Sequence, residues 1–270
     1  MFKFIHMKIK IFLVPLVLGI VISFNVIAQE MGGTMYVAAK TGLSIREKPD
    51  AAATVLDKIP YGTKITVLEL EEERKSNTTE GMLGFWQKVK YNNKTGFILD
   101  SYLLPWAPPK LATIKESDSY RMKNYLAQVA VPFGAKLTVK SGKMNNLNEA
   151  GWQVTKQLYK NGAEWHEHVG YEYGSTVYFL PGFTLQQGFL LLRLIPEFKE
   201  LIGEKDEFPK ESKTFKKGEI EYQVKIDKQV FNEDYSWVEK IHIEYSDGAS
   251  YIFELYMLDN QLVIFLASGV

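Results

Sequence analysis

The chain has 270 residues, of which 46% are hydrophobic and 24% are charged, and it contains 32 basic residues, 32 acidic residues and no cysteine. This composition is typical of a folded globular chain, and its balanced charge gives no electrostatic basis for binding nucleic acid, which requires a basic face. The absence of cysteine excludes disulfide bonds, thiolate metal sites and a cysteine nucleophile, and no lipid anchor on a cleavage-site cysteine is expected.

Residues 1–28 have the features of a secretory signal peptide. Lysines precede an apolar run over residues 11–22, and Val26 and Ala28 occupy the −3 and −1 positions of a cleavage site before Gln29. The alternative is an uncleaved membrane anchor, which a proline within the apolar run disfavours. We therefore expect export, with the protein periplasmic or extracellular after cleavage near Ala28 and in contact with the membrane only during export. Removal of residues 1–28 leaves 29 basic and 32 acidic residues, a net charge of −3.

Residues 35–104 are expected to form a small β-barrel or sandwich, because short apolar stretches are separated by turn-forming Gly, Pro, Asn and Asp. Leu43 and Ile45 alternate with polar residues, so one face of their strand packs inward. The polar stretch 71–80 is interpreted as an exposed loop between two strands. The expected strands cover residues 35–39, 43–46, 54–59, 64–70, 86–91 and 96–99.

Several short motifs follow one another in this region. They are Leu43-Ser44-Ile45-Arg46, Pro49, Gly62-Thr63, Trp86-x-x-Val89, Gly96-Phe97-Ile98 and Tyr102-Leu103. In their order and spacing these motifs resemble the bacterial SH3-like domain family. The chain departs from the family pattern in a longer segment before Trp86 and in Phe97, where the family usually has Trp. The resemblance implies an SH3-like β-barrel that binds a peptide or a cell-envelope component such as peptidoglycan.

Three aromatic residues of this domain are candidate ligand-binding residues, because aromatic side chains line the peptide grooves of SH3-type domains. Tyr61 and Tyr102 lie at turns or strand ends, which favours exposure. For Trp86 the sequence leaves ligand contact and core packing equally open, whereas Phe97 lies inside a strand and is expected in the core. Arg46 is expected to brace a loop or lie on the surface rather than to contact a ligand.

Residues 105–110, with the sequence PWAPPK, are expected to form a stiff, extended connector between two domains, because proline restricts the backbone. Residues 111–270 form the expected second domain, whose sequence suggests no known family. Its first expected helix covers residues 120–130, with Ser117 or Asp118 as the N-cap.

A strand ending near Leu158 leads into Asn161-Gly162, which is a strong signal for a hairpin turn. A two-residue loop at this point would pair Leu158 with Trp165 and Lys156 with Glu167 across the two strands. Both pairs are sensible cross-strand partners, so the sequence predicts this register.

Thr184-Leu185-Gln186-Gln187 has the pattern of a capping box and predicts the start of a helix. Apolar residues on every side of this helix indicate that it is buried, and it is too short to cross a bilayer. Pro196 is expected to end it and to start a second short turn. Residues 203–219 are rich in charged side chains and are interpreted as a solvated loop.

The C-terminal residues alternate between apolar and polar over several expected strands. A three-residue turn ending at Gly248 would place Ile241 opposite Phe253 and keep the apolar face intact. A two-residue turn at Asp259-Asn260 would place Met257 opposite Leu262 and Leu255 opposite Ile264. These strands form an antiparallel meander with at least one packed helix, hence an α+β domain. The expected fold class is therefore mainly β: a small SH3-like β-barrel followed by an antiparallel-sheet α+β domain.

The sequence WHEHVG, residues 165–170, is the strongest candidate for a metal site. In a strand, His166 and His168 project from one face about 7 Å apart, and two imidazoles at this spacing can bind Zn²⁺. A third ligand is required, and the sequence does not bring His242, the remaining histidine after the signal peptide, near them. An exposed polar strand face is the favoured interpretation, so no metal site is predicted.

Motifs for catalysis are absent from the sequence. It contains no G-x-S-x-G elbow, no H-E-x-x-H, no P-loop and no G-x-G-x-x-G. A papain-like Cys-His pair is excluded by composition, and a glycosidase pair of carboxylates stays open, because any two acidic residues could supply it. No catalytic residue and no cofactor is therefore predicted.

The favoured functional hypothesis is an exported, non-enzymatic binding protein whose SH3-like module binds a peptide, peptidoglycan or an envelope protein. The alternative is a cell-wall hydrolase with residues 111–270 as its catalytic part. A structural subunit of an envelope assembly is the third possibility.

Overall fold

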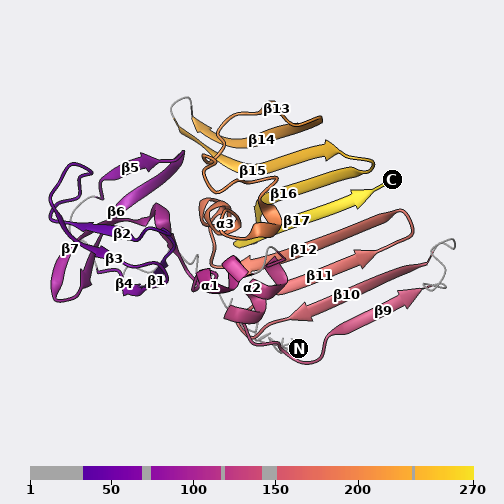
Figure 1. The fold of residues 1–270 in the computed structure, drawn as a ribbon, viewed down its shortest axis with the longest axis horizontal. Helices are drawn as coiled ribbons and strands as arrows, with labels where there is room; N and C mark the ends of the chain where they lie inside the picture. Colours follow the sequence, from indigo (N-terminus) through magenta and orange to yellow (C-terminus); the bar gives the residue numbers. More distant parts are fainter. Residues whose placement is uncertain (1–32, 69–73, 117–118, 142–150, 233–234) are drawn as a thin grey trace, which may run out of the picture.

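A computed structural model describes residues 33–68, 74–116, 119–141, 151–232 and 235–270. The predicted signal peptide, residues 1–28, and the predicted helix caps Ser117 and Asp118 lie outside these residues. The chain is mainly β, with small N-terminal sheets followed by a nine-stranded antiparallel sheet and few helices (Figure 1). Among the described helices, none is long and apolar enough to cross a bilayer.

The N-terminal residues form a small barrel from two antiparallel sheets, with strand orders β4-β1-β8 and β3-β2-β7-β6-β5. Leu43, Ile45 and Val89 lie in the core between these sheets, as the alternation predicted. Phe97 is half-buried and lies outside this core, contrary to expectation, because Ile98 beside it takes the inward position. The elements are β1 (Thr34–Val37), β2 (Leu43–Arg46), β3 (Val55–Ile59), β4 (Lys64–Thr66), β5 (Ser76–Thr79), β6 (Met82–Tyr91), β7 (Lys94–Leu99), η1 (Asp100–Tyr102) and β8 (Leu103–Leu104).

Two polar segments that were expected to be loops contain edge strands. Strand β5 lies within the stretch 71–80 and pairs with β6, and residues 69–73 lie outside the described part of the chain. Strand β13 (Lys213–Lys217) lies within the stretch 203–219 and pairs with β14. Each is the last strand of its sheet and is largely solvated, so neither needs the apolar alternation that marks a strand in a sequence.

Two helices follow the proline-rich connector, α1 (Leu111–Glu116) and α2 (Met122–Val129). The N-cap of α2 is Arg121, so the prediction of a cap at Ser117 or Asp118 was wrong. The backbone amide of Arg121 donates to the Asn124 side chain at 2.9 Å, and that of Met122 donates to the Glu197 carboxylate at 2.8 Å. A carboxylate from a distant segment therefore satisfies a helix end that local sequence leaves open.

The second half is built on one antiparallel sheet of order β13-β14-β15-β16-β17-β12-β11-β10-β9. Its remaining strands are β9 (Leu137–Ser141), β10 (Trp152–Leu158), β11 (Glu164–Val169), β12 (Tyr173–Pro181), β14 (Ile220–Asn232), β15 (Tyr235–Ser246), β16 (Ser250–Leu258) and β17 (Gln261–Gly269). Helix α3 (Leu185–Leu192) and the short helix η2 (Pro196–Phe198) lie against one face of the sheet (Figure 1).

Helix α3 is the buried helix that the sequence predicted. Thr184 is its N-cap, and Thr184 and Gln187 exchange two hydrogen bonds of 3.0 and 3.2 Å, which confirms the predicted capping box. Phe189 and Leu191 are among its fully enclosed residues, and η2 begins at Pro196, as expected. The helix thus fills the centre of the core of the second half.

The β10–β11 hairpin has a three-residue loop rather than the predicted two-residue loop. The Tyr159 amide donates to the Ala163 carbonyl at 2.9 Å, and Gly162 adopts a left-handed φ of 84°. Trp165 consequently lies opposite Gln157 instead of Leu158, and Leu158 lies opposite Glu164. The predicted pairs of this hairpin were therefore wrong, because one extra loop residue shifts every partner by one position.

The C-terminal turns were predicted more accurately. The loop between β15 and β16 has three residues, 247–249, and places Ile241 opposite Leu255 rather than Phe253. The shift of two positions gives each residue of β15 a different partner on β16. The same residues of both strands stay on the buried face, because side chains alternate with a period of two. The two-residue turn at Asp259-Asn260 is confirmed, with Met257 opposite Leu262 and Leu255 opposite Ile264.

Candidate functional site

The barrel is docked against the second half of the chain through a shared core. Ala38, Met82 and Leu104 of the barrel belong to the same buried cluster as α3 and the nine-stranded sheet. The turn between β5 and β6 supplies a backbone contact as well, because the Phe208 amide donates to the Glu80 carbonyl at 2.9 Å. The two halves therefore meet through buried apolar surface and not only through the connector.

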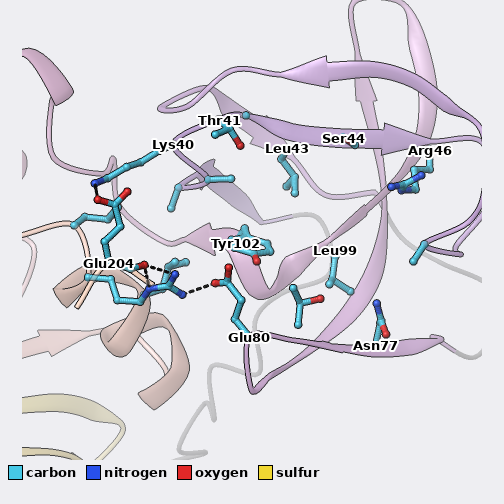
Figure 2. Close-up of a pocket in the computed structure, with 18 of the residues that line it drawn as sticks. Lys40, Thr41, Leu43, Ser44, Arg46, Asn77, Glu80, Leu99, Tyr102 and Glu204 are labelled. Atoms are coloured by element: carbon cyan, nitrogen blue, oxygen red, sulfur yellow. Dashed lines mark hydrogen bonds and ion pairs between the residues drawn. The ribbon is translucent and has the colours of Figure 1, made fainter. Parts of the chain in front are cut away.

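A pocket of about 390 Å³ opens at this junction (Figure 2). One side is formed by the barrel, from the loop before β2, from β2 itself and from the β5–β6 hairpin. The other side is formed by the end of α3 and the loop after it. Its neutral polar lining includes Thr41, Ser44, Asn77 and Thr79. The volume lies within the range of ordinary ligand pockets.

Two ion pairs connect the two sides of the pocket across the junction. Arg193 follows α3, has a side chain only 9% exposed and pairs with Glu80 at 2.5 Å. Its Nε also donates to the Glu204 carbonyl at 2.7 Å. Lys40 of the barrel pairs with the Glu204 carboxylate at 2.8 Å, and these two side chains are 31% and 61% exposed. The buried Arg193 is the stronger of the two connections, because exposed pairs contribute little.

Trp86 and Tyr102, two of the three predicted binding residues, both line this pocket. Trp86 is 5% exposed on β6, and Tyr102 lies beside Glu80 at the centre of the view in Figure 2. Burial and the negative charge of Glu80 raise the pKa of the Tyr102 phenol to about 12, so the phenol stays a neutral hydrogen-bond group. The structure therefore brings these two aromatic residues together in the lining of one pocket, whose other side includes Leu190 of α3.

Tyr61, the third predicted residue, lies in a neighbouring cavity of about 680 Å³. Its hydroxyl donates to the Pro109 carbonyl at 2.7 Å, and burial raises its pKa. The Gln128 side chain donates to the Pro108 carbonyl at 3.0 Å. The structure thus separates Tyr61 from Trp86 and Tyr102 and uses it to hold the connector.

Residues 41–103 match the bacterial SH3 domain family. This region is a bacterial SH3 domain. The match confirms the resemblance in the sequence and covers the barrel from β2 to the start of β8, while β1 precedes it and the residues after it are assigned to no family. No curated protein and no solved structure matches the chain significantly.

Arg46 of the SH3 domain performs the bracing role that the sequence predicted and also lines the pocket. Its Nη1 donates to the Ala53 carbonyl at 2.7 Å, which ties the end of β2 to the following loop. Sequence reasoning missed the pocket residues on β5 and all of those on α3. Glu80 and Arg193 are 113 positions apart, so no local pattern could connect them.

The strand that carries Trp86 is fixed by the half-buried carboxylate of Asp100. Asp100 accepts hydrogen bonds from the Phe85 amide and from the Gln87 side chain, both at 2.7 Å. Burial raises the pKa of the Asp100 carboxyl above its ordinary value, although these hydrogen bonds oppose the effect. Both neighbours of Trp86 on β6 are therefore anchored, which sets the position of the indole ring.

The predicted histidine pair lies on the face of the nine-stranded sheet opposite the buried Trp165. His166 Nε2 lies 2.8 Å from the Glu164 carboxylate, and the His168 ring contacts Trp152 and Tyr173 with centroid distances of 6.5 and 5.6 Å. No group of three or more His, Asp or Glu side chains in the described ranges is arranged to hold a metal ion.

Proposed function

We propose that the protein is an exported, non-enzymatic binding protein whose SH3 domain binds a peptide or peptidoglycan component of the cell envelope. The bacterial SH3 class supports this proposal, because such domains commonly bind the cell wall. The signal-peptide pattern of residues 1–28 supports export to the periplasm or the cell exterior. The ligand site of this proposal is the pocket between the SH3 domain and α3.

The residues that line the pocket are the reason for choosing it as the ligand site. Tyr102 is half-buried in the lining, and Trp86, Leu190 and Leu194 back the pocket as side chains that are at most 5% exposed. Hydroxyl and amide groups between them can bond to the backbone of an extended ligand. The lining is more polar than that of a typical small-molecule pocket and contains five charged side chains, so it suits a polar, extended ligand such as a peptide.

Filling the pocket is expected to weaken binding to peptidoglycan. Asn77 on β5 is half-buried and lines the pocket, so an Asn77→Trp side chain would occupy the ligand space. We expect residues 29–270 to co-sediment with purified peptidoglycan sacculi and Asn77→Trp to bind at least about tenfold more weakly, which corresponds to about 1.4 kcal/mol.

Thr78→Trp is the matched control. Thr78 is the next residue of the same edge strand, is exposed and does not line the pocket. This variant should be retained like the parent protein. Equal loss of binding in both variants would contradict the proposed site. If neither sacculi nor envelope proteins retain the parent protein, the proposed function is contradicted.

A further inference from the structure

We propose that the ligand of this pocket is an extended peptide bearing a free carboxylate, which the guanidinium of Arg46 binds. This inference rests on the proposed function and concerns the chemistry of the same site. Its starting point is the balance of charge in the pocket. The charged side chains that line it are Lys40, Arg46, Glu80, Arg193 and Glu204.

Four of these five side chains neutralise one another in pairs across the junction, Arg193 with Glu80 and Lys40 with Glu204. Arg46 is the remaining one, and no carboxylate of the described residues lies within ion-pair distance of it. The lining therefore carries one unmatched positive charge. A ligand with one negative group at that position would complete the balance.

The hydrogen bond between Arg46 and the Ala53 carbonyl holds the Arg46 guanidinium in a fixed position before a ligand binds. It uses one of the five guanidinium N–H donors and fixes the side chain in the pocket wall. The other donors remain for a ligand, and a guanidinium of fixed orientation matches the two oxygens of a carboxylate. Because the bracing bond is already made in the free protein, less side-chain freedom is lost when the ligand binds.

The shape of the pocket indicates an extended peptide rather than a compact anion. Figure 2 shows Arg46 and Asn77 at one end, Lys40 and Glu204 at the other, and Tyr102 between them. A ligand that spans this distance would pass Tyr102 and the neutral polar groups before its carboxylate meets Arg46. A phosphate polymer fits less well, because polyanions require several unmatched cations.

The test compares purified sacculi, freed of phosphate polymers by acid treatment, before and after chemical amidation of their peptide carboxylates. We expect amidation to weaken binding of residues 29–270 at least about tenfold, as loss of a charge-assisted pair does. Arg46→Gln should bind the untreated sacculi as weakly as the parent binds the amidated ones, and amidation should not weaken it further. Arg46→Lys should keep part of the preference, because it retains the charge and loses the planar fork.

Arg74→Gln is the control, since it removes the same charge from the SH3 domain and does not line the pocket. It should keep the full preference for free carboxylates, and thermal unfolding should show all variants folded. Equal binding of the parent to native and amidated sacculi would overturn this inference and leave the proposed function standing. Loss of binding on removal of the phosphate polymers would also overturn it. No retention on any sacculi would remove the proposed function as well.

Discussion

Replacing Gly81 with alanine is expected to lower the free energy of unfolding by about 3 kcal/mol, since it combines left-handed backbone strain with loss of a junction hydrogen bond. Gly81 has a φ of 74°, which L-residues rarely adopt. An added Cβ would lie 2.5 Å from the Phe208 carbonyl oxygen and 3.0 Å from its amide nitrogen. The β5–β6 turn would have to withdraw, and with it the Glu80 carbonyl that binds the Phe208 amide. Denaturant unfolding measures the effect.

Gly62→Ala separates the two causes. Gly62 has nearly the same φ, 76°, and an added Cβ there meets no atom within 4 Å. This variant should lose only about 1 kcal/mol, the cost of the backbone conformation alone. If Gly62→Ala and Gly81→Ala lose the same stability, the close contact between the turn and Phe208 does not hold the two halves together.

Replacing Glu80 with glutamine is expected to cost about 2 kcal/mol, because it leaves the Arg193 charge without its counterion in a site that is largely buried. The side chain of Arg193 is 9% exposed, whereas that of Glu80 is 39% exposed, so the effect falls below that of a fully enclosed pair. Chemical unfolding measures the effect.

Glu204→Gln provides the comparison for this ion pair. Its partner is Lys40, and the two side chains are 61% and 31% exposed. Loss of an exposed pair should cost no more than about 0.5 kcal/mol. The Glu204 backbone carbonyl that binds Arg193 is unchanged by this substitution. A cost for Glu204→Gln as large as that for Glu80→Gln would show that burial of Arg193 is not the source of the effect.

The sequence predicted the parts of the fold that leave a periodic or a turn signal. Leu43 and Ile45 alternate with polar residues, and the structure places both in the barrel core. The capping box at Thr184 and the turn at Asp259-Asn260 are local signals, and both elements form where expected. The turn at Asn161-Gly162 was located correctly, but the register of the two strands was not. The register depends on the length of the loop, and these two turn-forming residues do not determine that length.

The candidate site was only half predictable, because it is built by contacts between distant segments. Trp86 and Tyr102 could be proposed from their place in the SH3 pattern. Arg193 could not, since a charged residue at the end of an apolar helix looks like an ordinary helix terminus. Strand β5, which carries Asn77 and Thr79, is polar and has no alternation of apolar residues. Its role in the pocket follows from its pairing with β6.

The second half of the chain forms part of the proposed binding site. Leu190, Arg193 and Leu194, in α3 and just after it, form the wall of the pocket that lies across from the SH3 domain. The shared core of Met82 and Leu104 with α3 keeps that wall in place. The specificity of the site is therefore expected to depend on residues outside the SH3 domain.

Hydrogen–deuterium exchange of residues 29–270, with and without soluble peptidoglycan fragments, locates the binding site directly. We expect slower exchange on both sides of the junction at once, in residues 41–46 and 76–80 of the SH3 domain and in residues 190–194, at the end of α3 and just after it. Protection confined to the SH3 domain, or placed on the nine-stranded sheet away from α3, would contradict a binding pocket formed jointly by the two halves.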